Sequence, residues 1–237
     1  MKRLLPFIII LLVLGVAVAS AYYLKRSSTS VTPVSYPVST PASSSPSGSP
    51  GATTTPTEPV AGAEPAHVLG PKSAPVQLEE FGDFECPPCG LLHPILLQMH
   101  KEFGDKIAIT FREFPLVPAH QHAIAAASSA EAAGLQGKFW EMHDLLYENQ
   151  KNWHETFDVR PIFEGYAKQI GLDMARFQQD VNGEAVAQRI FLDGKRGHSL
   201  GVKGTPTVFM NGKEVPFEAL PADKLRVLIQ NELKGSR

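Results

Sequence analysis

The stretch of sequence that decides the fold is residues 81–90, Phe-Gly-Asp-Phe-Glu-Cys-Pro-Pro-Cys-Gly. It follows residues 76–81, whose β-favouring composition between Pro75 and Gly82 predicts a strand. Residues 91–99 after it have the apolar pattern of a helix, although a proline interrupts them. Two cysteines three positions apart therefore lie where a strand turns into a helix.

The elements around this turn predict the fold class. Residues 106–114 read as a second strand, so strand, helix and strand form a unit whose strands should be parallel. Helical patterns follow over residues 120–133, 138–149, 159–170, 173–181 and 184–200. A strand at 206–210, the hairpin signal Asn211-Gly212, a short strand near Val215 and a helix at 221–233 complete the chain. The pattern predicts an α/β fold with a helical insertion at about 118–200.

The cysteines have the spacing and position of a redox pair. The N-terminus of a helix presents free N–H groups and a positive dipole, which favour the thiolate of Cys86. Cys89, one turn further, can attack a mixed disulfide at Cys86 and release the partner. Pro87 and Pro88 suit a first helical turn, where their missing N–H groups would have no partner. We expect thiol–disulfide exchange, with Cys86 as nucleophile and Cys89 as resolving residue.

The two cysteines could also form a structural disulfide or bind a metal. The chain has only these two cysteines, and a structural disulfide between them would close too short a loop to stabilise much. A zinc site could draw on His93, His120 or His122, but no second ligand pair has the usual spacing. Copper binding by Cys86, Cys89 and one histidine remains the alternative of a different class. We expect surface or capping roles for His100, His143, His154 and His198, and core or subdomain-contact roles for Trp140 and Trp153.

The N-terminal residues predict export. Residues 4–24 form an uncharged, mostly apolar run long enough to cross a bilayer. Lys2 and Arg3 precede it, so the remainder should lie outside the cytoplasm, on the periplasmic side. Residues 1–26 are interpreted as a single-pass membrane anchor; the alternative is a signal peptide cleaved near Ala21, which would give a secreted protein.

Composition separates a linker from a folded domain. Residues 27–66 are mostly Ser, Thr and Pro, cannot bury much apolar surface, and are expected to be a disordered linker before a domain at 67–237. The whole chain of 237 residues has a formal net charge of −2, which gives no sign of nucleic-acid binding.

Residues 81–89, the helical insertion and the later Val-Lys-Gly-Thr-Pro-Thr-Val-Phe at 202–209 resemble the DsbA-like thioredoxin-fold oxidoreductases over roughly residues 70–235. The resemblance implies that Pro206 follows a cis bond beside the cysteines and that Thr205 presents its backbone to substrate; a trans Pro206 is the alternative. It also implies a buried acid at Glu80. Alternation along the strand agrees with a Glu80 side chain that points into the protein and helps to move the proton of Cys89. A solvent-exposed Glu80 is the alternative.

The resemblance implies a protein thiol:disulfide oxidoreductase that acts on protein thiols or disulfides and needs a membrane or extracytoplasmic redox partner. It implies no metal and no organic cofactor. An oxidase is favoured because exported proteins mostly need disulfides made, with a reductase or isomerase as the alternative. Pro87-Pro88 departs from the Pro-His of strong oxidants and from the Gly-Pro of thioredoxin, which leaves the direction of electron flow open.

Overall fold

The computed structural model describes residues 60–235, which belong to one compact unit. The expected membrane segment and residues 27–59 of the expected linker lie outside the described residues. Within residues 60–235, no helix is long and apolar enough to cross a membrane.

A five-stranded mixed sheet forms the centre of the domain, in the order β1-β3-β2-β4-β5. The strands are β1 (His67–Leu69), β2 (Val76–Gly82), β3 (Ile107–Glu113), β4 (Thr207–Met210) and β5 (Lys213–Val215). β2 and β3 are parallel, as predicted, and the other neighbouring pairs are antiparallel. The predicted hairpin at Asn211-Gly212 is confirmed, and both residues have the positive φ that this tight turn requires.

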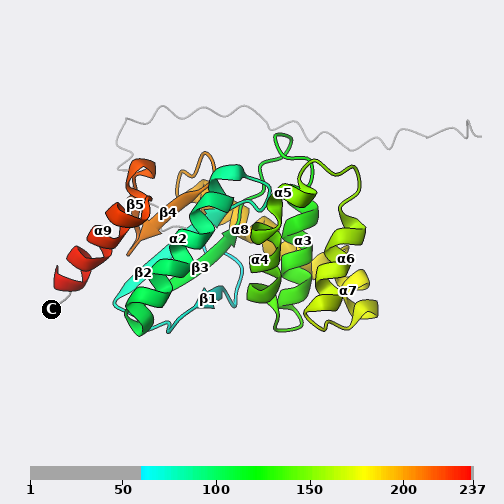
Figure 1. The fold of residues 1–237 in the computed structure, drawn as a ribbon, viewed down its shortest axis with the longest axis horizontal. Coiled ribbons are helices and arrows are strands. Elements are labelled where there is room, and N and C mark those ends of the chain that lie inside the picture. The colour runs from blue at the N-terminus through cyan, green and yellow to red at the C-terminus, as the bar shows by residue number, and fades with distance from the viewer. Residues whose placement is uncertain (1–59, 236–237) are drawn as a thin grey trace, which may run out of the picture. The chain divides into compact units, whose positions relative to one another are not determined.

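Helices pack apolar side chains against the sheet. α2 (Pro87–Phe103) and α9 (Ala222–Gly235) share one core with the inward residues of β2 and β3 (Figure 1). That core includes Leu78, Leu96, Ile109, Leu225 and Ile229. Two short 3-10 helices, η1 (Gly104–Lys106) and η2 (Phe217–Ala219), lie in the connections.

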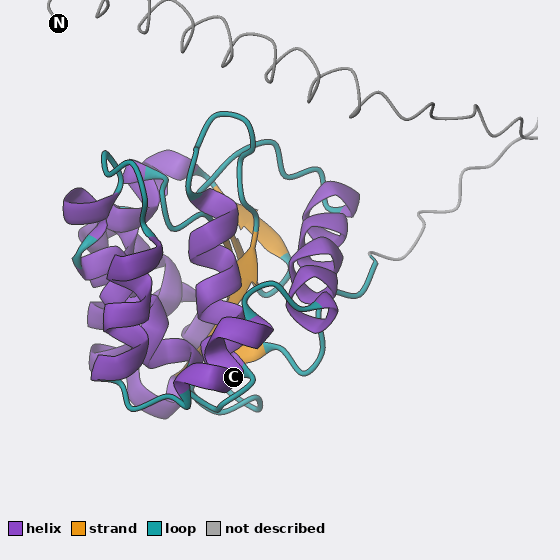
Figure 2. Ribbon diagram, turned by 90° about the vertical axis from the view of Figure 1, so that its right-hand side faces the viewer, coloured by secondary structure: helices purple, strands orange, loops and turns teal. Residues whose placement is uncertain are grey.

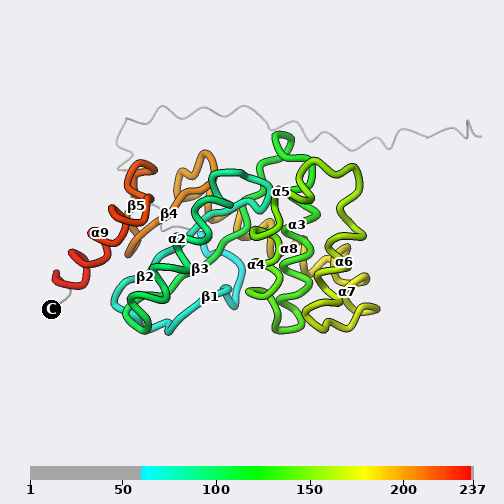
Figure 3. The backbone as a smooth tube through the Cα atoms, viewed as in Figure 1, coloured from blue at the N-terminus to red at the C-terminus, as the bar shows by residue number. Residues whose placement is uncertain are grey.

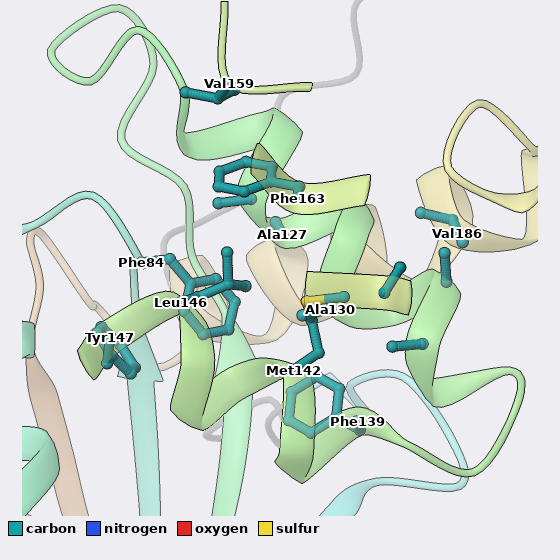
Figure 4. Close-up of a cluster of buried hydrophobic side chains, with 14 of the residues drawn as sticks. Phe84, Ala127, Ala130, Phe139, Met142, Leu146, Tyr147, Val159, Phe163 and Val186 are labelled. Atoms are coloured by element: carbon teal, nitrogen blue, oxygen red, sulfur yellow. The ribbon is translucent and has the colours of Figure 1, made fainter. Parts of the chain in front are cut away.

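The predicted helical insertion is confirmed. After β3 the chain passes through six helices and then returns to the sheet at β4 (Figure 3). They are α3 (Ala123–Gly134), α4 (Phe139–Glu148), α5 (Gln150–Trp153), α6 (Arg160–Gln169), α7 (Met174–Asp180) and α8 (Glu184–Ser199), and they form a bundle beside the strands (Figure 2). Alanines of α3 allow close packing around Met142, Leu146 and Phe163 (Figure 4). Asp173 caps α7 as expected, because its side chain accepts the N–H of Arg176.

The domain begins before the expected boundary at residue 67, because residues 60–66 contact the remainder of the fold. Ala63 is fully buried, and its N–H donates to Oδ1 of Asp193 at 2.7 Å. Its carbonyl accepts a hydrogen bond from Nη1 of Arg112 at 2.8 Å. Composition indicates a linker here because the segment has small side chains and no large apolar residue, but two buried charged side chains, Asp193 and Arg112, satisfy its backbone.

Candidate active site

Cys86 lies at the N-terminus of α2 and is its N-cap residue. Its N–H donates to the carbonyl of Asp83 at 3.1 Å, and its carbonyl accepts the N–H of Gly90 at 3.2 Å. Pro87 and Pro88 occupy the first helical positions, where no intrahelical N–H bond is lost. The strand-to-helix turn therefore places Cys86 at the positive end of the α2 dipole.

The two cysteines carry free thiols and meet the loop that precedes β4. Cys89 is completely buried and Cys86 is 4% exposed. Sγ of Cys86 donates a hydrogen bond to the carbonyl oxygen of Thr205 at 3.2 Å, and the Thr205-Pro206 bond is cis, as the resemblance implied. The same loop lines a cavity of about 380 Å³ that Lys203 and Glu214 border. Residues over one hundred positions apart in the sequence are thus brought to one place.

The environment shifts the pKa values of the two thiols in opposite directions. A hydrogen bond from the Cys89 thiol, aided by the Thr205 side chain, lowers the pKa of Cys86 to about 6 against the opposing effect of burial. Burial, the same thiol–thiol bond and the nearby charge of Glu80 raise the pKa of Cys89 well above its usual value. At neutral pH the pair therefore holds one thiolate, on Cys86, and one thiol, on Cys89; the hydrogen bond from Cys86 to the Thr205 carbonyl belongs to the protonated form of Cys86.

Glu80 lies inside the protein in the middle of β2, opposite Phe111 of β3 and Val208 of β4. It is 2% exposed, so the solvent-exposed alternative is wrong. Its Oε1 atom is buried without a hydrogen-bond partner. Burial, and then the negative charge of Cys86, raise the pKa of Glu80 to about 8. The carboxyl group therefore holds a proton at neutral pH close enough to the cysteines for the charges to interact.

Asp83 is a site residue that the sequence did not reveal. Its Oδ1 accepts the N–H of Glu85, and its Oδ2 accepts the N–H of Leu116, both at 2.8 Å. Nδ1 of His120 lies 2.7 Å from Oδ2, and this bond raises the pKa of His120 although partial burial lowers it. These bonds hold the loop after β3 against the active-site turn, which explains why α3 begins at Ala123 rather than at His120.

Gln150 is the second unforeseen residue, and it comes from the helical insertion. Its Nε2 donates to the carbonyls of Phe84 at 2.7 Å and of Cys86 at 2.9 Å. Gly90 makes room for it, because a Cβ at that position would lie 2.6 Å from Oε1 of Gln150. No local pattern in the sequence connects a glutamine on α5 with a turn more than sixty residues earlier.

The structure places some of the histidines differently from what the sequence predicts. Within residues 60–235, the cysteines belong to no close group of three or more metal-type ligands; the group of that kind is His93, His143 and Asp144. His143 was expected at the surface or at a cap and is 4% exposed, because it packs among aromatic rings. Trp153 is buried and Trp140 packs against the core, as expected.

Fold and site define a thioredoxin-like protein with a pair of thiols at the start of α2. The family model described as thioredoxin matches residues 63–231, and the chain belongs to this family. Similar solved structures include BdbD from Bacillus subtilis, which is 24% identical with a TM-score of 0.64 over 75% of this chain and 100% of that one. A thioredoxin-like oxidoreductase from Silicibacter pomeroyi is 25% identical with a TM-score of 0.59 over 71% and 92%. MdbA, a thiol-disulfide oxidoreductase from Corynebacterium diphtheriae, is 20% identical with a TM-score of 0.58 over 73% and 92%.

Curated relatives carry a different name. A Na(+)/H(+) antiporter NhaA 1 from Salinispora arenicola is 43% identical over 148 residues, which are 62% of this chain and 22% of that protein. The protein of the same name from Mycolicibacterium gilvum is 36% identical over 170 residues, or 67% and 26%. The chain spans about a quarter of the length of these relatives, so their name describes much longer proteins.

Proposed function

We propose that the chain is an extracytoplasmic dithiol oxidase, which makes disulfides in protein substrates through the Cys86–Cys89 pair. The observation that carries the proposal is the contrast between the lowered pKa of Cys86 and the raised pKa of Cys89. A stable Cys86 thiolate favours the reduced pair over the disulfide, and so makes the disulfide a stronger acceptor of electrons.

The reaction begins with the Cys86–Cys89 disulfide. A substrate thiolate attacks Sγ of Cys86, the bond between the two cysteines breaks, and Cys89 leaves as a thiolate. Because the pKa of buried Cys89 is raised, this thiolate takes up a proton, and protonated Glu80 is the nearby donor. A second substrate thiolate then attacks the substrate sulfur of the mixed disulfide and releases Cys86 as a thiolate. The substrate is oxidised by two electrons and the pair is reduced.

Thr205 and Pro206 are assigned to substrate docking. The Thr205 carbonyl accepts a hydrogen bond from the Cys86 thiol, so it is a backbone acceptor beside the reacting sulfur. The cavity of about 380 Å³ next to it gives room for an extended substrate segment. Docking here would present a substrate sulfur to Cys86 rather than to fully buried Cys89.

Two observations support action outside the cytoplasm. Residues 4–24 have the length and apolar character of a membrane segment, with basic residues before them. One of the similar structures is a periplasmic thioredoxin-like protein from Salmonella enterica, with a TM-score of 0.59. In this arrangement a membrane or extracytoplasmic redox partner reoxidises the pair after each turnover.

The test uses the oxidised full chain and a reduced, unfolded model protein with two cysteines. Acid quenching, alkylation and mass spectrometry should show one substrate disulfide for each pair reduced. Cys89→Ser, loaded beforehand as a mixed disulfide of Cys86 with glutathione, should react at Cys86 with a single-cysteine substrate and release glutathione as a thiolate, so that a mixed disulfide between Cys86 and the substrate accumulates; Cys86→Ser, treated in the same way, should form none. Full exchange activity in a natively folded Cys86→Ser variant would overturn the assignment. Tight Cu(I) binding by the reduced pair without any thiol exchange would favour copper handling instead.

A further inference from the structure

His93 on α2 and the neighbours His143 and Asp144 on α4 bring three metal-type ligands together away from the cysteine thiols. Oδ1 of Asp144 lies 3.0 Å from Nδ1 of His143 and 3.8 Å from Nε2 of His93. All three ligand atoms lie within 4.8 Å of one another. Both histidines are more than nine-tenths buried, whereas the Asp144 side chain is 37% exposed. The group is thus a buried pair of imidazoles behind one carboxylate that faces solvent.

These separations suit a small divalent ion. Zinc bonds of about 2.0–2.1 Å in a tetrahedral arrangement place neighbouring ligand atoms about 3.3 Å apart. The two distances from the Asp144 oxygen, 3.0 and 3.8 Å, lie on either side of that value. The ligand atoms of the two histidines lie within 4.8 Å of each other, so the side chains would draw together around an ion, and the partly exposed carboxylate leaves a route of entry.

Aromatic rings enclose the imidazole of His143. Rings of Phe111, Trp140 and Tyr147 lie within 5.0 Å of the imidazole centroid, and Phe84 and Phe139 lie slightly further away; Figure 4 labels Phe84, Phe139 and Tyr147. Nε2 of His143 is buried there without a hydrogen-bond partner. Nε2 of His93, which is also more than nine-tenths buried, has no hydrogen-bond partner either.

Nδ1 of His143 lies within hydrogen-bond distance of Oδ1 of Asp144, at 3.0 Å. Nε2 of His93 lies 3.8 Å from the same oxygen, which is too far for a hydrogen bond. A metal ion bound among the three atoms would give the buried His93 nitrogen the partner that it lacks.

We propose that His93 Nε2, His143 Nδ1 and Asp144 Oδ1 bind a zinc ion, with water in the fourth position. Imidazole nitrogens and a carboxylate oxygen are ligands that zinc prefers, whereas a monovalent copper ion would select thiolates. The site is separate from the proposed exchange chemistry, because neither cysteine sulfur contributes to it.

The test uses the full chain with Cys86→Ser and Cys89→Ser, so that thiols cannot bind the metal. Titration with Co²⁺ should give a visible spectrum of a tetrahedral nitrogen and oxygen site at one ion per chain, and Zn²⁺ should displace it. His93→Gln and Asp144→Asn should each weaken binding more than tenfold. His154→Gln, a matched histidine outside the group, should leave binding unchanged.

Asp144→Asn is the decisive variant, because its side chain is partly exposed and its loss should not disturb the core. Zn²⁺ should raise the melting temperature of the cysteine-free parent and of His154→Gln, but not that of Asp144→Asn. The proposal is wrong if the parent with native near-ultraviolet circular dichroism binds no ion. It is equally wrong if His93→Gln and Asp144→Asn, both folded, bind as tightly as the parent. Neither result would bear on disulfide exchange.

Discussion

The thiol of Cys86 donates a hydrogen bond to the carbonyl of Thr205 at 3.2 Å, across 119 positions of sequence. The sheet makes this contact possible, because Phe81 of β2 pairs with Thr207 of β4. Cys86 follows Phe81 by five residues and Thr205 precedes Thr207 by two, so both lie at the same end of the sheet. The Cys-Pro-Pro-Cys turn and the loop that we propose docks substrate are therefore held together by strand register.

The ionisation of Cys86 should be visible directly. In the reduced protein, thiolate absorbance at 240 nm should appear with a midpoint near pH 6, the lowered pKa of Cys86. Cys86→Ser should lose this transition. Cys89→Ala should move it upward, because the side chain that donates to the Cys86 sulfur is gone. A midpoint near pH 9 in the unmodified chain would contradict the described environment of Cys86.

The same pKa predicts how stability depends on pH in the reduced protein. The folded-state pKa of Cys86, about 6, is below its ordinary value of 9.0, so the thiolate stabilises the fold fully above pH 9 and loses this effect as pH falls through 6. The oxidised protein has no such group. From pH 6 to 8 the free energy of unfolding of the reduced form should rise by about 1 to 2 kcal/mol relative to that of the oxidised form, with solvent screening taken into account. Calorimetry of both forms measures the difference, and parallel pH curves would count against it.

Glu80→Gln should increase the free energy of unfolding and slow thiol–disulfide exchange. The folded pKa of Glu80, about 8, is above the ordinary 4.5, so the folded carboxyl keeps a proton that the unfolded chain releases, and stability falls as pH rises from 4.5 to 8. Removing this cost should add about 3 kcal/mol to the free energy of unfolding at pH 7. Exchange should slow because Cys89 loses its proton donor. Urea unfolding at pH 5 and pH 8, with exposed Glu148→Gln as control, tests the stability, and single-turnover kinetics test the rate.

Gln150→Leu should loosen the active-site turn. It leaves the carbonyls of Phe84 and Cys86 without their side-chain donor, which costs about 1 to 3 kcal/mol. Chemical denaturation measures this loss. Gln179→Leu, on the exposed side of α7, provides the control and should change stability by less than about 0.5 kcal/mol. Equal effects of the two substitutions would mean that the Gln150 amide does not hold the turn.

Asp193→Ala should release residues 60–66 from the domain. Asp193 accepts from Ala63 and from Arg112, whose Nη1 lies 3.0 Å away, and its loss leaves a buried guanidinium without this partner. The expected cost is about 3 to 5 kcal/mol, with new protease cleavage near residue 63. Asp180→Ala, which removes the exposed pair with Arg176, should cost less than about 1 kcal/mol. Unchanged protease resistance would show that the segment is held by other contacts.

Local signals in the sequence predicted much of this molecule. Alternation and composition identified β2 and β3, and Asn211-Gly212 identified the hairpin, because these features depend on neighbours a few residues apart. The Cys-Pro-Pro-Cys turn predicted a redox pair for the same reason, since both cysteines lie within one turn of helix. Gln150 and Asp83 could not be found in this way, since their partners are set by tertiary packing. His143 appeared unremarkable because aromatic rings from separate elements, among them Phe84, Phe111 and Trp140, enclose it only in the folded chain.

The reduction potential of the Cys86–Cys89 pair tests the central claim most directly. The full chain would be equilibrated with glutathione buffers of known ratio, and the fraction oxidised measured by alkylation and mass spectrometry. The lowered Cys86 pKa of about 6 lies between those of thioredoxin, about 7, and of a strong disulfide donor, about 3.5, and therefore predicts a potential between about −270 and −120 mV. A potential near about −270 mV, that of a thioredoxin-type reductant, would contradict the proposal that this protein makes disulfides in its substrates.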